Sequence, residues 1–102
     1  MNREIRNKFI YQLQALQHKY TAQRSDIEKN LSDLHRDQTK VAIQLPFLIH
    51  EEHSKAMNRL EVIKKDIQNQ KRELTKINDK ITEANFELNE LKKKENETKV
   101  IE

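Results

Sequence analysis

Residues 50–53 have a composition that could bind a metal ion. His50 and His53 flank two glutamates, Glu51 and Glu52. The two histidines are three residues apart, whereas the helices of zinc metalloproteases place their histidines four residues apart. Glutamates in the first turn of a helix also interact favourably with the helix dipole. We therefore interpret this stretch as the start of a helix and predict no metal site.

The rest of the chain offers no group of residues suited to catalysis. His18 and His35 stand alone on expected helix faces. The sequence contains no cysteine and no glycine, which excludes a thiolate nucleophile, a thiolate metal site and a glycine-rich phosphate loop. A pair of helices has no deep pocket that would exclude water from a reacting group. We therefore expect no enzymatic activity, no catalytic residue and no cofactor.

Basic residues form the only clusters that could bind phosphate groups. They are Lys64-Lys65, Lys71-Arg72, Lys92-Lys93-Lys94, and the group Arg3, Arg6 and Lys8. Residues 1–44 hold eight Lys and Arg against five Asp and Glu, and residues 45–102 hold twelve of each kind. Because charges of both signs alternate, an ordinary solvated helix surface is the favoured interpretation. A nucleic-acid-binding helical hairpin is kept as an alternative function.

The composition favours long helices over a globular core. Only 34% of the residues are apolar and 36% are charged, which suits helices that each bury a single stripe. Without glycine the chain has few residues suited to tight turns, so a β-sheet fold is disfavoured. We find no signal-peptide pattern, no apolar stretch long enough to span a membrane, and no cysteine. The expected location is the cytoplasm.

A heptad repeat organises both halves of the sequence. In the second half, apolar residues recur every seven positions at Leu60, Ile67, Leu74, Ile81 and Leu88, with a companion series of Ala56, Ile63, Gln70, Ile77, Ala84 and Leu91. The first half has a rougher pair of series: Leu13, Tyr20, Ile27, Leu34 and Val41, and Ile10, Gln17, Arg24, Leu31, Gln38 and Leu45. This periodicity is typical of coiled-coil helices that bury one seam.

The two halves are separated by Pro46, which disfavours helical geometry in the residue before it and is favourable at the start of a new helix. We predict an all-α fold in a single domain: an antiparallel two-helix coiled-coil hairpin. The expected bounds are a helix over about 3–43, an apolar turn over 44–50, a second helix over about 47–94, and a frayed tail at 95–102. A continuous rod that dimerises in parallel is the competing arrangement. Association of two hairpins into a four-helix bundle is compatible with the first.

The register of the hairpin follows from aligning the two seams. If the numbers of facing residues add to about 94, Leu31 lies opposite Ile63 and each a position meets a d position. The same alignment places Arg24 opposite Gln70. We therefore predict that these two residues form a polar layer that fixes the register. In the alternative interpretation, Arg24 extends along its apolar stem to reach water.

Two surfaces could bind partners. The first is the apolar tip at the turn, which consists of Leu45, Pro46, Phe47, Leu48 and Ile49. A hairpin has no second layer to cover its turn, so we expect an exposed patch there, with Leu45 and Ile49 folded inward and with Phe47 and Leu48 exposed. The second is a strip near the open end, formed by Ile5, Phe9, Leu16 and Phe86.

The function expected from these features is that of a non-enzymatic structural or adaptor subunit, a scaffold that docks into a protein assembly through its tip and helical faces. The protein partner is unspecified, and a homodimer is one possibility. The runner-up is a stalk or escort protein of a bacterial type III export apparatus. This chain is similar to those proteins in format, as a small antiparallel coiled coil with a charged surface, and shares no residue motif with them.

Overall fold

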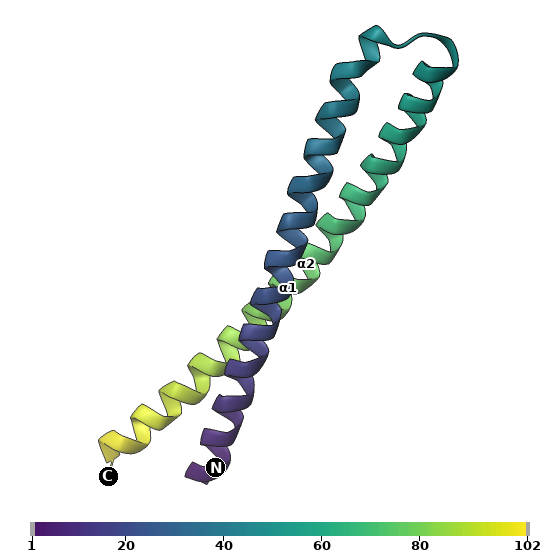
Figure 1. Ribbon diagram of the computed structural model, residues 1–102. Helices are drawn as coiled ribbons and strands as arrows, with labels where there is room; N and C mark the ends of the chain where they lie inside the picture. The colour runs from purple at the N-terminus through teal and green to yellow at the C-terminus, as the bar shows by residue number, and fades with distance from the viewer. Residues whose placement is uncertain (1, 102) are drawn as a thin grey trace. The chain divides into compact units, whose positions relative to one another are not determined.

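The protein is an all-α helical hairpin, as the sequence predicts. The computed structural model describes residues 2–101, and it describes the side chains of residues 2–94. Helix α1 spans Arg3–Gln44, a short 3-10 helix η1 spans Leu45–Phe47, and helix α2 spans His50–Ile101 (Figure 1). The described residues contain no β-strand. Helices α1 and α2 run antiparallel and pack against each other.

Helix α1 begins with a polar cap. The side-chain Oδ1 of Asn2 accepts a hydrogen bond of 2.9 Å from the backbone N–H of Glu4, and the Asn2 carbonyl accepts one of 2.9 Å from the N–H of Arg6. Asparagine is among the preferred residues at this position, because it satisfies an N–H group that has no partner within the helix. Glu4 lies in the first turn, where a negative charge favours the helix dipole.

The connection between the helices is formed without glycine. Pro46 stands at the start of η1, where its missing N–H is tolerated. Leu48 then adopts an extended conformation with φ −97° and ψ 142°, and its N–H donates a 3.2 Å hydrogen bond to the Leu45 carbonyl. His50 has a φ of 53°, in the left-handed region. Histidine is one of the residues that enter this region more readily than most, although a Cβ atom makes it less favourable than for glycine.

The predicted bounds of α2 need correction at both ends. The helix begins at His50 rather than near residue 47, because Leu48 is extended and His50 turns the chain. It continues to Ile101, whereas the sequence predicts an end near residue 94 and a frayed tail. Residues 95–101 break the heptad pattern, but they include no proline or glycine to stop the helix.

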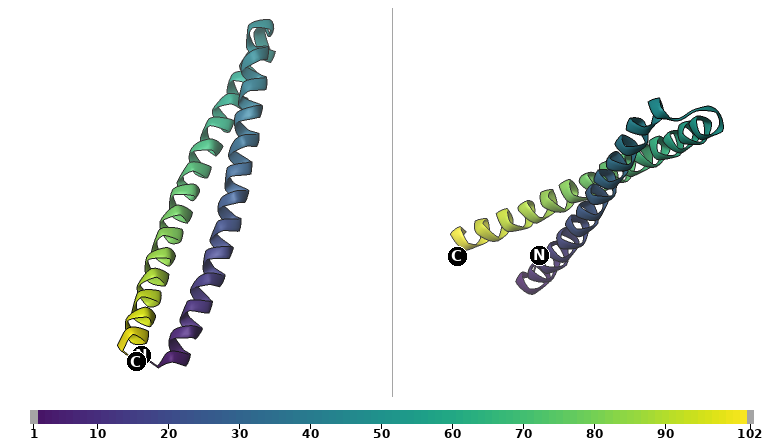
Figure 2. Two further views of the ribbon diagram at one scale, coloured as in Figure 1. Left: turned by 90° about the vertical axis from the view of Figure 1, so that its left-hand side faces the viewer. Right: turned by 45° about the horizontal axis from the view of Figure 1, so that its top comes forward.

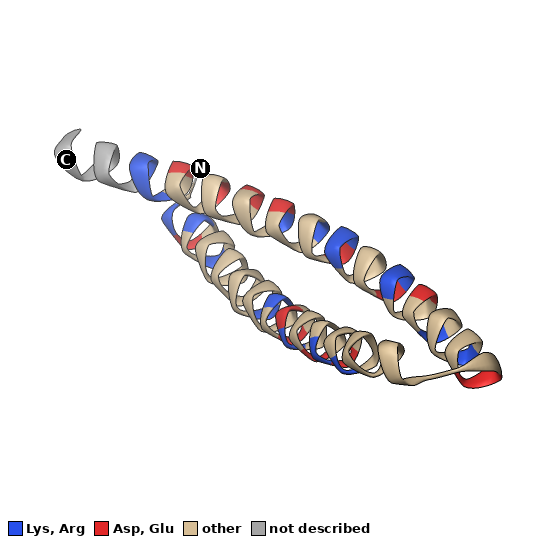
Figure 3. Ribbon diagram, turned by 90° about the horizontal axis from the view of Figure 1, so that it is seen from above, with Lys and Arg blue, Asp and Glu red and all other residues tan. Residues whose placement is uncertain are grey.

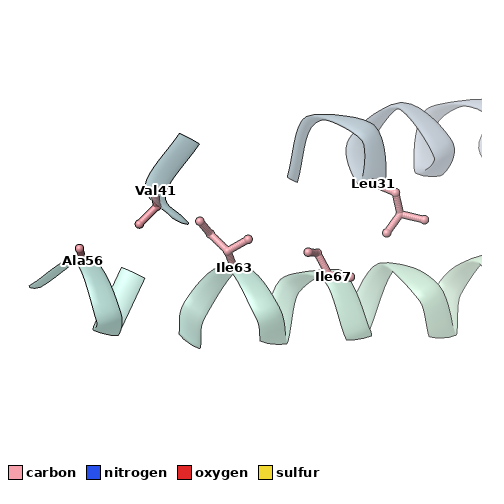
Figure 4. Close-up of a cluster of buried hydrophobic side chains, with 5 residues drawn as sticks. All are labelled: Leu31, Val41, Ala56, Ile63 and Ile67. Carbon is pink, nitrogen blue, oxygen red and sulfur yellow. The ribbon is translucent and has the colours of Figure 1, made fainter. Parts of the chain in front are cut away.

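The chain divides into two compact units. The connection unit comprises residues 25–75 and includes η1, and the terminal unit comprises residues 1–24 and 76–102. In the connection unit, segments of α1 and α2 lie side by side from each direction of view (Figures 1 and 2). Its buried core consists of Leu31, Val41, Ala56, Ile63 and Ile67 (Figure 4). The partly buried residues packed on this core are Ile27, Leu34, Leu45, Leu48, Leu60 and Leu74.

The terminal unit has a more polar interior. Its buried apolar residues are Ile77, Ala84 and Leu88, and Arg6 is buried with them at 7% exposure. The amide of Gln17 donates a hydrogen bond to Asn85 Oδ1 across the pair of helices. Lys80 Nζ lies 5.6 Å from the centroid of the Tyr20 ring, within the range of a cation–π contact. Arg6, Gln17 and Asn85 thus place polar or charged groups in the interior of this unit, whereas the seam of the connection unit is mainly apolar.

Every position of the predicted heptad seams is at least partly buried within its own unit. Leu31 and Val41 on α1 and Ala56, Ile63, Ile67, Ile77, Ala84 and Leu88 on α2 are the most buried of the apolar residues. Burial every three and four residues is what a coiled-coil seam requires. The seam is therefore confirmed position by position.

The predicted register is wrong by one heptad. In the terminal unit, Gln17 bonds to Asn85 and Tyr20 contacts Lys80. In the connection unit, Val41 lies between Ala56 and Ile63 along α2, and Leu31 lies beyond Ile67 rather than opposite Ile63 (Figure 4). The numbers of facing residues therefore add to about 101, and not to about 94.

The heptad repeat itself explains this error. Two registers that differ by seven residues bury the same seam positions, so the seam cannot distinguish them. The connection decides, since α1 continues to Gln44 and both Leu45 and Leu48 pack against the core before α2 starts. The midpoint of the hairpin consequently lies between His50 and Glu51 rather than at Phe47.

Candidate protein-docking surfaces

The connection displays large apolar side chains to solvent. Phe47 is 83% exposed, Ile49 is 68% exposed and Ile43, in the last turn of α1, is 63% exposed. Soluble monomers rarely leave such residues clustered at one place without a function. We define Ile43, Phe47 and Ile49 as the tip residues, and they form the first candidate docking surface.

Leu48 and Ile49, two of the residues predicted for the tip, are oriented opposite to the prediction. Leu45 is packed against the core as expected, but so is Leu48, which was expected to be exposed. Ile49 was expected to fold inward and is instead exposed. The reason is the backbone at Leu48, which is extended after η1. Successive side chains of an extended segment point to opposite sides, so Ile49 turns outward when Leu48 packs on the core.

Ile43 was not predicted as part of the tip. It lies two residues after the buried Val41, and two residues correspond to a rotation of about 200° around a helix. Ile43 must therefore point away from α2. An apolar residue in such an outward position, next to a helix end, is the signal in the sequence that could have identified it.

A second exposed apolar strip lies on α1 in the terminal unit. Ile5, Phe9 and Leu16 are all exposed, and their spacing of four and seven residues places them on one face of the helix. Phe86 is also exposed, at 65%, but it does not belong to this strip. It stands two residues from the buried Ala84 and two from the buried Leu88, so it points away from α1.

The predicted polar layer of Arg24 and Gln70 is also wrong. The register of the terminal unit places Arg24 level with Ile77, and the register of the connection unit places Gln70 level with Leu31. Arg24 is partly buried. The Oε1 atom of Gln70 is buried and has no hydrogen-bond partner among the described residues. A buried acceptor without a partner destabilises the fold.

Grooves run along one face of the connection unit. One is lined by Asn30, Asp33, Leu34, Asp37, Asp66, Asn69 and Gln70. A second, which shares Asp37, is lined by Asp37, Lys40, Val41, Gln44, Arg59, Val62 and Ile63. A third, nearer to the connection, is lined by Val41, Gln44, Leu48, Glu52, Lys55, Ala56 and Arg59. The first two grooves share Asp37, and the last two share Val41, Gln44 and Arg59, so the three follow one another along this face, which we call the channel face.

The basic clusters of the sequence do not combine into a single patch. Arg6, one of the residues expected at a basic end, is buried in the terminal unit. Lys and Arg alternate with Asp and Glu along the described parts of both helices (Figure 3). A nucleic-acid-binding surface normally gathers basic residues on one face, so the alternative of a nucleic-acid-binding hairpin loses support.

Among the described side chains, no group of three or more His, Cys, Asp or Glu could hold a metal ion. No helix within the described residues combines the length and the apolar content needed to cross a membrane. Comparisons with protein-family models, curated proteins and solved structures found no match for this chain.

Proposed function

We propose that this chain is a non-enzymatic structural or adaptor subunit of a cytoplasmic protein assembly, and that it docks onto a protein partner through the tip residues. The observation that carries the proposal is the exposure of Phe47, Ile49 and Ile43 at the connection. These residues lie outside the seam, so the fold does not require them to be apolar. Their exposed area would be removed from water by a partner.

The partner surface that fits the tip residues is an apolar pocket. An aromatic ring and two β-branched side chains present a rigid surface that loses little rotamer entropy on binding. Full burial of such side chains contributes roughly 1.5–3 kcal/mol each. Two of them, Phe47 and Ile49, are therefore enough to change affinity by several orders of magnitude. The stiff helices behind them would hold the tip in a fixed orientation.

The test compares two variants of the full chain in pull-downs from the native host. Phe47→Ser with Ile49→Ser should leave helicity and thermal stability nearly unchanged, because both side chains are exposed. This tip variant should lose the proteins that the wild type captures. The matched control, Phe9→Ser with Leu16→Ser, changes two exposed apolar residues in the terminal unit and should retain them.

Three outcomes oppose the proposal in different ways. If the tip variant captures the same proteins as the wild type, the tip is not the docking surface. If only the control variant loses them, the strip of Ile5, Phe9 and Leu16 takes its place. If circular dichroism shows that the tip variant has unfolded, Phe47 and Ile49 stabilise the hairpin and are not a free surface.

A further inference from the structure

The channel face of the connection unit has opposite charges at its two ends. Lys40, Lys55 and Arg59 line the part nearer to the connection, together with one acidic residue, Glu52. Asp33, Asp37 and Asp66 line the part farther from it. The part nearer to the connection thus has three basic residues against one acidic residue, whereas the charged residues of the farther groove are all acidic. By net charge, the channel face is therefore positive near the connection and negative farther from it.

Between the two charged zones lies an exposed apolar residue. Val62 is 59% exposed and lines the central groove between Arg59 and Asp66. It follows Arg59 by three residues and precedes Asp66 by four, so all three lie on one side of α2. An apolar centre flanked by charges is the usual composition of a protein–protein interface.

This pattern is complementary to itself. We infer that a second copy of this chain docks antiparallel on the channel face, related to the first by a two-fold axis near Val62. A rotation about that axis places the basic zone of each copy over the acidic zone of the other. Arg59 then faces Asp66 of the second copy, Lys40 faces its Asp37, and Lys55 reaches the end where its Asp33 and Gln70 lie. A parallel arrangement would instead set like charges against each other.

Two local ion pairs on these helices do not compete strongly with this arrangement. Lys55 Nζ lies 3.5 Å from Glu51 Oε1, and Arg36 Nη1 lies 4.0 Å from Asp33 Oδ1. Both pairs are exposed and lie within one helix, where such contacts contribute little.

Gln70 adds an independent feature at the acidic end of the channel, because its buried Oε1 lacks a donor. In the antiparallel pair, the ammonium group of the second copy's Lys55 arrives at this end.

The inference does not depend on the proposed docking of the tip residues. It predicts that the wild-type chain forms a dimer whose mass is measurable by sedimentation equilibrium. The dimer should weaken as salt is raised to about 1 M, where the Debye length falls to about 3 Å. The variant Phe47→Ser with Ile49→Ser should dimerise as the wild type does, so failure of one proposal is distinguishable from failure of the other.

The decisive experiment exchanges charges between the two zones. The acid-reversed variant carries Asp33→Lys, Asp37→Lys and Asp66→Lys, and its channel face is basic at every charged position except Glu52. The base-reversed variant carries Lys40→Glu, Lys55→Glu and Arg59→Glu, and its face is acidic throughout. Each variant alone should self-associate at least about 100-fold more weakly than the wild type, because like charges meet at both ends. Mixed in equal amounts, the two should form a heterodimer.

A control variant, Lys64→Glu with Lys71→Glu, reverses two charges on α2 away from the channel and should dimerise normally. Formation of the heterodimer also shows that both reversed variants are folded. A wild-type chain that sediments as a monomer up to millimolar concentration overturns the inference. So does a mixture of the reversed variants that stays monomeric, or self-association of either variant that equals that of the wild type.

Discussion

The connection unit and the terminal unit share one heptad periodicity but bury different chemistry. In the connection unit, five buried apolar residues form a contiguous core between α1 and α2. In the terminal unit, the apolar residues Ile77, Ala84 and Leu88 share the interior with Arg6 and with the Gln17–Asn85 hydrogen bond. Periodicity thus determines which positions face the partner helix, and composition determines how much each position stabilises the pair.

The difference also separates stability from specificity. An apolar core stabilises the pair of helices in proportion to the apolar area that it buries. It also tolerates a shift of one helix along the other, because one leucine packs much like another. A hydrogen bond between Gln17 and Asn85 forms only when those two residues are level. We therefore expect the connection unit to supply most of the stability, and the polar contacts of the terminal unit to disfavour other registers.

The largest effect should come from crosslinking, which tests the register in each unit. Leu31→Cys with Gln70→Cys in the connection unit, and Leu13→Cys with Leu88→Cys in the terminal unit, should be joined nearly completely within one chain by a short thiol reagent under dilute conditions. Leu31→Cys with Ile63→Cys should react poorly, because a shift of seven residues separates the thiols by about 10 Å along the helices. Mass spectrometry distinguishes the products, and efficient joining of residues 31 and 63 would restore the register first predicted.

Next in size is the loss of a buried isoleucine from each unit. Ile67→Ala should lower the free energy of unfolding by about 3 kcal/mol, because Ile67 is buried within the apolar core. Ile77→Ala should lower it by nearer 2 kcal/mol, because Ile77 is level with the polar Arg24 and has fewer apolar neighbours to lose. Urea unfolding followed by circular dichroism measures both. A larger loss from Ile77→Ala would reverse the comparison between the two units.

Replacement of a seam glutamine by leucine should change the free energy of unfolding by a smaller amount, and differently in the two units. Gln70→Leu removes a buried Oε1 without a partner and should raise the free energy of unfolding by about 1 kcal/mol. Gln17→Leu makes the same chemical change but deprives Asn85 of its donor, which costs about 1–3 kcal/mol and offsets the added apolar contact. Thermal unfolding of the two variants decides the matter. Equal stabilisation by both changes would show that the Gln17–Asn85 bond contributes nothing.

The smallest change in the free energy of unfolding should come from a substitution at the connection between the helices. His50→Gly should raise the free energy of unfolding by roughly 0.5–1 kcal/mol, because glycine adopts a positive φ without the steric cost of a Cβ atom. The matched control His53→Gly, three residues further along α2, should lower it by about 1 kcal/mol, because glycine weakens a helix interior. The two variants can be compared in one calorimetric series. Destabilisation by His50→Gly would mean that a contact of the imidazole stabilises the fold by more than the positive φ of His50 destabilises it.

The sequence predicts the fold and the seam well, for a physical reason. Burial of a helix stripe repeats every three and four residues, so the positions that face the partner helix can be counted along the chain. Every residue that this rule assigned to the seams is at least partly buried, including Gln17, Arg24 and Gln38. It could not choose between two registers one heptad apart, because both satisfy it.

The tip was predicted in outline but not in detail. Its exposure followed from five consecutive apolar residues at a turn, and Phe47 was correctly expected to be exposed. The orientations of Leu48 and Ile49 depend on the extended backbone at Leu48 and on the positive φ of His50. No periodic pattern encodes those dihedral angles. The burial of Arg6 was missed for a similar reason, because a long charged side chain in a seam position can either reach water or stay inside.

The equivalence of the two registers has a consequence for the kinetics of folding. A chain that collapses with its seams displaced by one heptad buries nearly the same apolar area as the native hairpin, so the early compact state contains both pairings. Escape from the wrong pairing requires separation of the helices, because a slide of seven residues passes through arrangements that put polar side chains in the seam. We expect refolding to show a slow phase from this trapped population, which a preformed Leu31–Gln70 crosslink would abolish.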